Sequence, residues 1–236
     1  MTIVPAPDVR DPASALKLPA DQLYARLLAS AVQHAASDAP PPRVRLRSAD
    51  GASEPLPLDA WLAPTTPPDD RIVARSLAPV LDVGCGPGRL LEALAAAGKQ
   101  ALGVDLVAMA VTIANARGGR AVEGSIFADV PGAGRWATAL LLDGNIGIGG
   151  HPEALLDRVG TLLAPGGEAI VEVDPPGYPT RTTNVRIEAS DAVSEWFVWS
   201  RVAADDLAPI AADAGLPCAE LFEDDGRWFA CLVRGA

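Results

Sequence analysis

Short apolar runs alternate with segments of helical apolar spacing over the last two thirds of the chain, from about residue 71 onward. Five of the runs have the length and composition of buried strands. This alternation is typical of βαβ units and predicts a parallel sheet with helices on both faces. The predicted strands are residues 80–83, 101–104, 120–122, 138–142 and 169–173.

The pattern changes after residue 174. Residues 182–187 and 196–202 each have strand character and predict a hairpin, which is an insertion at about 178–200. A helix is expected over 204–214, and a closing hairpin over 219–222 and 228–233 around Asp224-Asp225-Gly226. The expected fold class is therefore α/β: a Rossmann-like, doubly wound, mostly parallel seven-stranded sheet with an antiparallel C-terminal hairpin strand.

The first 70 residues hold 12 of the 22 prolines, which predicts a more irregular segment than the rest. We expect a loosely ordered N-terminus over 1–20 and a small helix and hairpin appendage over 21–70, a candidate substrate cap. Its helix starts at Asp21 and has apolar residues at helical spacing, namely Leu23, Leu27, Leu28 and Val32. Residues 71–236 then form the core domain.

The composition of the 236 residues bears on the partners, the metal content and the cellular location to be expected. A net charge of −11 opposes adhesion to the phosphates of nucleic acid or to anionic lipid. Cys85, Cys218 and Cys231 lack the spacing of a disulfide framework or a zinc site, so no metal is expected. The N-terminus has no secretory pattern, and no apolar run is long enough to span a membrane. A cytoplasmic protein is expected, and 17 Arg against 2 Lys suggests a bacterial genome rich in GC.

The clearest candidate for a binding site is a predicted strand that leads into a glycine-rich loop and then a helix. Its sequence is Val80-Leu81-Asp82-Val83-Gly84-Cys85-Gly86-Pro87-Gly88-Arg89. Glycines are needed where the backbone turns tightly and a ligand approaches the main chain. A dinucleotide fingerprint requires G-x-G-x-x-G, whereas the spacing here is G-x-G-x-G. Asp82 also places a carboxylate beside the loop, which would repel a pyrophosphate but suits a cationic ligand.

This segment resembles motif I of the class I S-adenosylmethionine-dependent methyltransferases. Asp105, 21 residues after Gly84, stands where that family uses an acidic residue to bind both ribose hydroxyls. Gly124-Ser125-Ile126 resembles the family's adenine-contacting loop, which commonly has Asp where this chain has Ser125. Residues 162–167, Leu-Leu-Ala-Pro-Gly-Gly, match its usual turn before the fifth strand, so the resemblance covers residues 72–173.

The resemblance implies S-adenosylmethionine as cofactor and S-adenosylhomocysteine as product. It implies a methionine end shaped by the glycine loop, a ribose held by Asp105, and an adenine bound beside Leu106 and closed in by Ser125 and Ile126. The residues expected to bind the cofactor are Asp82, Gly84, Cys85, Gly86, Gly88, Asp105, Leu106, Ser125, Ile126 and Asp143.

The donor methyl in this family faces the ends of the fourth and fifth strands, which directs attention to residues 143–151, Asp-Gly-Asn-Ile-Gly-Ile-Gly-Gly-His. Asp143 or Asn145 can orient an acceptor or contact the methionine amino group. His151 can act as a base near neutral pH or serve as an ordinary helix-terminus residue. These three are the candidate catalytic residues. Phosphate binding by this segment is disfavoured because no Lys follows it and Asp143 carries negative charge.

Aromatic side chains of the insertion, Trp196, Phe197 and Trp199, together with Trp61, can stack on a planar acceptor or belong to the core. Our leading hypothesis is a methyltransferase that acts in line on O, N or C of a small molecule, with no nucleic-acid or membrane partner. The alternative is a non-catalytic protein that binds S-adenosylmethionine or S-adenosylhomocysteine. A nicotinamide-dependent oxidoreductase is disfavoured by the glycine spacing.

Overall fold

A computed structural model describes residues 15–34 and 43–235 and divides the chain into two compact units. The larger unit comprises Asp59–Thr183 and Val198–Ala236, and the smaller comprises Met1–Leu58 and Asn184–Phe197. The insertion predicted at about 178–200 thus contributes to the same unit as the N-terminal segment. The expected loosely ordered residues 1–14 lie outside the described part, whereas Leu16–Leu18 form strand β1.

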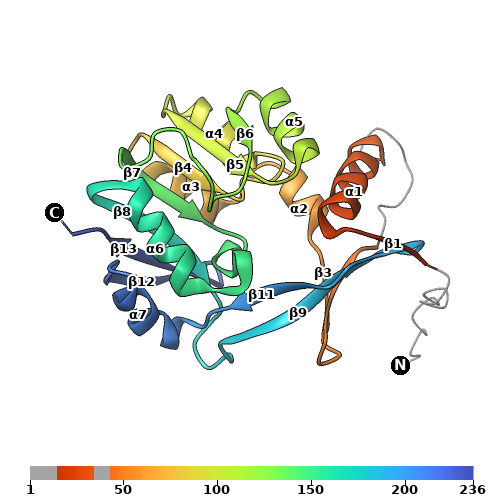
Figure 1. Ribbon diagram of the computed structural model, residues 1–236. Coiled ribbons are helices and arrows are strands. Elements are labelled where there is room, and N and C mark those ends of the chain that lie inside the picture. Colours follow the sequence, from red (N-terminus) through yellow and green to blue (C-terminus); the bar gives the residue numbers. More distant parts are fainter. Residues whose placement is uncertain (1–14, 35–42, 236) are drawn as a thin grey trace. The chain divides into compact units, whose positions relative to one another are not determined.

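The larger unit is built on a seven-stranded sheet in the order β12-β13-β8-β7-β4-β5-β6 (Figure 1). Strands β6, β5, β4, β7 and β8 are parallel, whereas β13 is antiparallel to both β8 and β12. This arrangement confirms the predicted fold class. The strands are β4 (Val80–Val83), β5 (Ala101–Asp105), β6 (Ala121–Glu123), β7 (Trp136–Leu141), β8 (Leu163–Val173), β12 (Cys218–Asp224) and β13 (Arg227–Val233).

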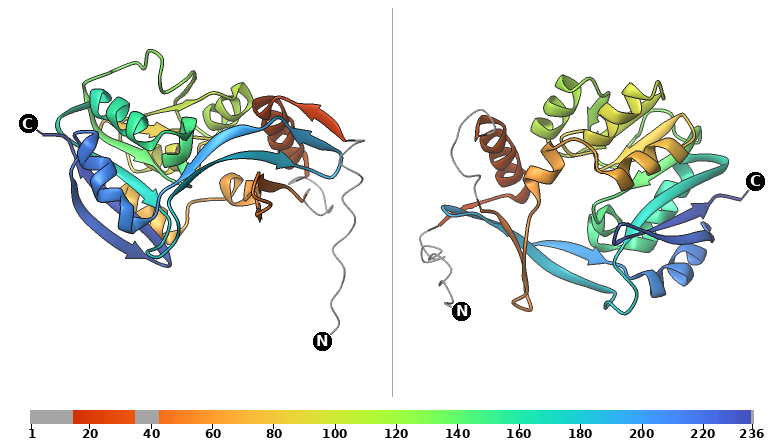
Figure 2. Two further views of the ribbon diagram at one scale, coloured as in Figure 1. Left: turned by 60° about the horizontal axis from the view of Figure 1, so that its bottom comes forward. Right: turned by 180° about the vertical axis from the view of Figure 1, so that it is seen from behind.

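Helices cover both faces of this sheet, as the turned views in Figure 2 also show. Strand β7 illustrates the alternation, because Leu141 packs among residues of α6 and α7 whereas Leu140 packs among residues of α3 and α4. The helices are α3 (Pro67–Arg75), α4 (Arg89–Ala96), α5 (Ala108–Ala116), α6 (Pro152–Leu162) and α7 (Ala204–Asp213), with a 3₁₀ segment η2 (Asn145–Gly150) and the short α2 (Leu58–Leu62).

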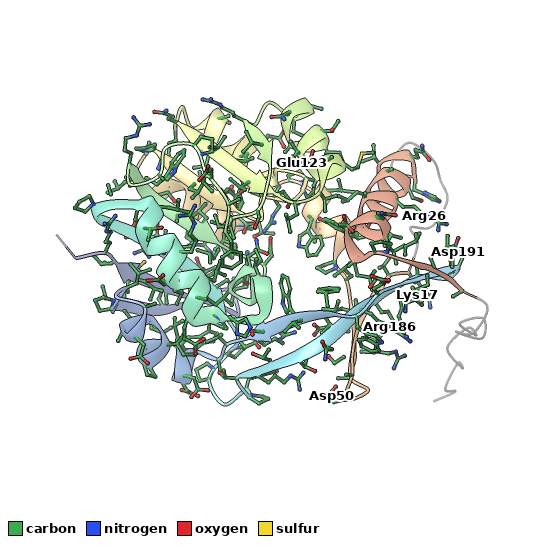
Figure 3. All side chains as sticks on the ribbon, viewed as in Figure 1. Lys17, Arg26, Asp50, Glu123, Arg186 and Asp191 are labelled. Atoms are coloured by element: carbon green, nitrogen blue, oxygen red, sulfur yellow. The ribbon has the colours of Figure 1, made fainter. Side chains whose placement is uncertain are left out.

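The smaller unit has a sheet in the order β1-β10-β9-β2-β3, with β11 also paired to β9. Strands β9 and β11 each continue into the larger unit. Arg26 of α1 forms an ion pair with Asp191, just before β10 (Figure 3). The elements are α1 (Ala20–His34), β2 (Arg45–Ser48), β3 (Ser53–Pro55), β9 (Arg181–Glu188), β10 (Ala192–Ser194) and β11 (Phe197–Arg201).

Helix α1 differs from the prediction in its apolar face. Leu23, Leu27 and Leu28 are buried as expected, but Ala31 completes the face and Val32 is 44% exposed. At 100° per residue, Val32 lies nearly opposite Leu23, whereas Ala31 falls between Leu27 and Leu28. The prediction that Val32 belongs to the apolar face was therefore wrong, because the residue is apolar but lies on the other side of the helix.

Candidate functional site

The glycine loop follows β4 and leads directly into α4. Gly84, Gly86 and Gly88 have φ values of 68°, 52° and 84°, in the left-handed region that favours glycine. A Cβ at Gly88 would lie 2.5 Å from the Cβ of Ala114 in α5, so only glycine allows this close packing. The loop is therefore a tight backbone turn, and the side chains around it determine which ligand it can bind.

Asp105 is the last residue of β5, and its carboxylate accepts hydrogen bonds from both the glycine loop and the turn that follows β5. One carboxylate oxygen accepts the N–H of Gly86 at 2.9 Å, and the other accepts the N–H of Val107 at 2.8 Å. Burial raises the pKa of the carboxyl above its ordinary value, while these two N–H groups act to lower it. The residue is half-buried, and each oxygen retains a further lone pair for a ligand.

Asp82 lies within β4, on the face that packs against α3 and α4. It is 2% exposed, and its Oδ2 has no hydrogen-bond partner among the described residues. Burial raises the pKa of Asp82 to about 7; the Arg89 guanidinium opposes this, whereas the nearby carboxylates of Asp143 and Asp105 add to it. An unpaired carboxyl in such a place is costly to the fold and is typical of a site that awaits a cationic partner.

The predicted adenine residues lie on the loops after β5 and β6. Leu106 is 62% exposed and Ile126 is buried. The Oγ of Ser125 accepts the N–H of Phe127 at 3.2 Å, so the hydroxyl stabilises its own loop. Cys85 is buried against Gly103, and burial raises the pKa of its thiol. Its contact with the cofactor stays a prediction.

The segment after β7 turns sharply. Asp143 and Gly144 both have positive φ, 57° and 79°, and η2 follows. Asn145 donates from Nδ2 to the carbonyls of Val83 at 2.8 Å and Gly84 at 3.0 Å. The structure thus brings the predicted Asn145 directly against the glycine loop.

The remaining predicted catalytic residues have different surroundings. The Asp143 carboxylate accepts hydrogen bonds from Arg89, with Nη2–Oδ1 at 3.0 Å. His151 is exposed at the N-terminal end of α6, where its side chain makes no capping hydrogen bond.

Two aromatic residues of the insertion, Trp199 and Trp196, have different surroundings. Trp199 packs on the backbone of η2, because a Cβ at Gly147 would lie 2.5 Å from its Nε1. Trp196 lies under the Arg186 guanidinium, 4.8 Å from its ring centroid, in the smaller unit.

The sequence interpretation missed four charged residues that contact Asp143 directly or one another: Asp69, Arg89, Glu172 and Arg227. One local signal was available, since Thr66 and Asp69 form a capping box at the start of α3. The other contacts join residues up to 158 positions apart, which no local pattern encodes.

No group of three or more His, Cys, Asp or Glu side chains within residues 15–34 and 43–235 is arranged to hold a metal ion. Over the same described ranges, none of the helices combines the length and apolar character that crossing a membrane requires.

Known methyltransferases are similar to this chain in sequence pattern and in fold. A family model described as a methyltransferase domain matches residues 25–221. No curated protein matches the chain. A solved S-adenosylmethionine-dependent methyltransferase from Bacteroides fragilis, in complex with S-adenosyl-L-homocysteine, is similar with a TM-score of 0.75 and 21% identity, over 95% of this chain and 100% of that one.

Two further solved structures share the fold. The 1,6-didemethyltoxoflavin-N1-methyltransferase of Burkholderia thailandensis has a TM-score of 0.53 and 20% identity, over 72% of this chain and 78% of that one. A methyltransferase from Methanosarcina mazei has a TM-score of 0.56 and 14% identity, over 73% and 99%. Since the family model spans most of the sequence, the chain belongs to the methyltransferase-domain family, which confirms its predicted membership of the class I S-adenosylmethionine-dependent methyltransferases.

Proposed function

We propose that this methyltransferase transfers a methyl group in line from S-adenosylmethionine to an O, N or C atom of a small-molecule acceptor. The observation that carries the proposal is that both carboxylate oxygens of Asp105 can accept a further hydrogen bond. Asp105 lies at the carboxyl edge of the sheet, beside the glycine loop. Each oxygen already accepts one backbone N–H, so its orientation is fixed, and each keeps capacity for one hydroxyl. A vicinal diol such as a ribose satisfies both.

The residues present fit the methionine end of the cofactor. Asp82 offers a buried carboxylate oxygen without a partner among the described residues, and the left-handed glycine turn begins two residues after it in the chain. A cationic group bound here would compensate the charge that burial disfavours. S-adenosylmethionine, when bound, supplies an activated methyl group on a sulfonium sulfur.

For the adenine end, we propose contacts with the exposed Leu106 and with Ser125 and Ile126 on the following loop. The Ser125 hydroxyl still has capacity for another hydrogen bond. This arrangement leaves adenine recognition mainly to apolar contact.

We propose that the acceptor binds at the carboxyl ends of β7 and β8, beside η2. Orientation and exclusion of water supply most of the rate for a methyl donor that is already activated, so a strong base is not required. His151 stays a candidate base because its side chain is exposed. Asp143 and Asn145, whose polar groups are engaged by Arg89 and by the glycine loop, fit an orienting role better.

A small-molecule acceptor is supported by two similar structures, a methyltransferase with bound 1,6-didemethyltoxoflavin and an amino pentose methyltransferase. The net charge of −11 further disfavours nucleic acid as the acceptor. A cytoplasmic location stays a prediction from cysteine use.

The ribose site is tested by isothermal titration calorimetry with S-adenosylhomocysteine. Asp105→Ala removes two charge-assisted hydrogen bonds, each worth about 1.5 kcal/mol or more, and should weaken binding by at least about 100-fold. Glu123→Ala is the matched control, because Glu123 pairs in register with Asp105 on β6 and is exposed. Equal affinity of both variants would place the ribose elsewhere, and tight binding of NAD in place of S-adenosylhomocysteine would refute the proposed cofactor.

The alternative, a non-catalytic protein that binds the cofactor, is favoured by one observation: the Asp143 carboxylate is held by Arg89 and so is not free to act as a base. Incubation with S-adenosylmethionine carrying an isotopic methyl label and a panel of small molecules separates the two. Label in any acceptor supports the enzyme, whereas tight binding without turnover across the panel supports the alternative.

A further inference from the structure

Five charged side chains from five segments of the larger unit form a continuous cluster, here called the ionic network: Asp69 of α3, Arg89 of α4, Asp143 after β7, Glu172 of β8 and Arg227 of β13. Arg89 bridges Asp69, at 3.2 Å from Nη2, and Asp143. Arg227 bridges Asp69 at 2.7 Å and Glu172 at 2.7 Å, and its Nη2 lies 3.6 Å from Asp143.

Burial makes the ionic network sensitive to the loss of any member. Asp69 is fully buried, and the Arg89 side chain is 9% exposed. Burial acts to raise the pKa of Asp69, but the Thr66 N–H and the two guanidiniums together lower it to about 2. The charges are thus mutually compensated, and removal of one would leave its partners buried and unpaired.

The ionic network ends at the sharp turn after β7. The N–H of Asp143 donates to Oε2 of Glu172 at 2.6 Å, and the Asp143 side chain is held by Arg89. These contacts fix a non-glycine residue in a left-handed conformation, which costs about 1–2 kcal/mol by itself. The turn sets the position of Asn145, whose amide binds the carbonyls of Val83 and Gly84.

The ionic network also acts on the unpaired carboxyl of the proposed cofactor site. Charged groups from several elements face Asp82: Arg89 of α4 favours its ionised form, whereas Asp143, Asp105 and Asp69 oppose it. Arg89 is the only one of these groups that compensates the burial of Asp82.

We propose that the ionic network positions the cofactor pocket: Arg89 and Asp143 hold the turn after β7 so that Asn145 fixes the glycine loop that follows Asp82. The proposal rests on the proposed function, since it assumes that the glycine loop and Asp82 bind the methionine end of S-adenosylmethionine. It adds residues from α3, β8 and β13, none of which belongs to the glycine loop or to the ribose turn.

The first test is a double-mutant cycle read out by calorimetry with S-adenosylmethionine and with S-adenosylhomocysteine. Arg89→Met, Asp143→Asn and the double variant are compared with the wild type at a temperature where all are folded. Each single variant should weaken binding about 10- to 100-fold, and the double variant should weaken it by much less than the product of the two. Asn145→Ala, which leaves the ionic network intact, should weaken binding about tenfold and provides a variant with little risk to folding.

The matched control is the exposed ion pair between Arg71 of α3 and Asp224 of β12 in the same unit. Arg71→Met and Asp224→Asn, alone and together, should leave the affinity unchanged within about twofold. Arg89→Lys keeps the charge but loses the forked geometry, and should restore part of the affinity lost in Arg89→Met.

The second test is a readout that a purely structural role would not move. The pH at which the affinity for S-adenosylmethionine reaches half of its maximum should rise by about one unit in Arg89→Met, because the cation that favours ionised Asp82 is gone. Arg71→Met should leave that pH unchanged. A wild type that binds neither ligand would refute the proposed function itself. A wild type that binds, with Arg89→Met and Asn145→Ala unchanged in affinity and pH profile, would refute the ionic network's role alone.

Discussion

Asp82 should make the protein less stable as the pH rises, and Asp82→Asn should remove that dependence. Burial raises the pKa of this carboxyl from an ordinary 3.8 to about 7 in the folded protein. The folded state therefore keeps the proton over a pH range in which the unfolded state has lost it. Stability falls with increasing pH through this range, the reverse of the usual behaviour of a paired carboxylate.

The magnitude follows from the difference between the two pKa values. A difference of about 3 pH units at about 1.36 kcal/mol each amounts to about 4 kcal/mol lost above pH 8. Between pH 5 and pH 8 alone, the loss is about 2.5 kcal/mol. The amide introduced by Asp82→Asn would carry its own burial cost of about 1–3 kcal/mol, but that cost is the same at every pH and cancels from the comparison.

Urea denaturation followed by circular dichroism at pH 5, 6, 7 and 8 measures the effect. The free energy of unfolding of Asp82→Asn, relative to the wild type, should increase by about 2.5 kcal/mol from pH 5 to pH 8, with unchanged slope in urea. Glu123→Gln, at an exposed position on β6, is the control and should track the wild type. If the free energy of unfolding changed with pH in the same way for wild type and Asp82→Asn, the carboxyl would already be charged at pH 5 in the folded protein, and the reasoning would be refuted.

Three further predictions concern other residues and ligand binding of the larger unit. Gly88→Ala should cost about 2–4 kcal/mol in the free energy of unfolding, from its left-handed backbone and the contact with Ala114, whereas Gly98→Ala, also left-handed but with no atom within 4 Å of its Cβ, should cost about 1 kcal/mol. Thermal or urea unfolding compares the two, and equal costs would contradict the packing argument. Iodoacetamide at pH 8 should modify the half-buried Cys218 before Cys85 or Cys231, because those two are buried and burial raises the pKa of Cys231 to about 11. Mass spectrometry of the folded protein measures the order of labelling. Early labelling of Cys85 would contradict this prediction. Affinity of the wild type for S-adenosylmethionine should rise about tenfold from pH 6 to pH 8 as Asp82 ionises, and calorimetry should show a smaller change in Asp82→Asn; the same rise in both would show that Asp82 does not cause it.

The five parallel strands of the larger unit could be predicted from the sequence because each contains a short apolar run next to glycine or a turn. Val80–Val83 and Trp136–Leu141 are buried almost throughout, so their composition alone marks them. The glycine loop was equally legible, since its spacing reflects local backbone geometry.

Helix α3 was missed because Pro67 and Pro68 were interpreted as part of an irregular lead-in. The structure places them at the first helical positions, where proline is tolerated, after a capping box between Thr66 and Asp69. The capping signal was present and outweighed the prolines.

Local patterns predicted two hairpins of the smaller unit's sheet, one within 21–70 and one over 182–202, but they did not predict how the two hairpins join. Its β2 pairs with β9, so that Arg47 lies opposite Arg186, and the long stretch of sequence between them carries most of the core of the other unit. The ionic network was missed for the same reason, since Arg227 and Asp69 meet only in the folded chain. Charged residues at a functional edge are specified by tertiary contacts, which leave no period in the sequence.

The central claim is tested most directly by a crystal structure of the protein with S-adenosylhomocysteine. Both ribose hydroxyls should lie about 2.6–3.0 Å from the two carboxylate oxygens of Asp105, with the methionine end against the glycine loop near Asp82. A ligand bound away from Asp105, or one whose ribose contacts other groups, would contradict the account.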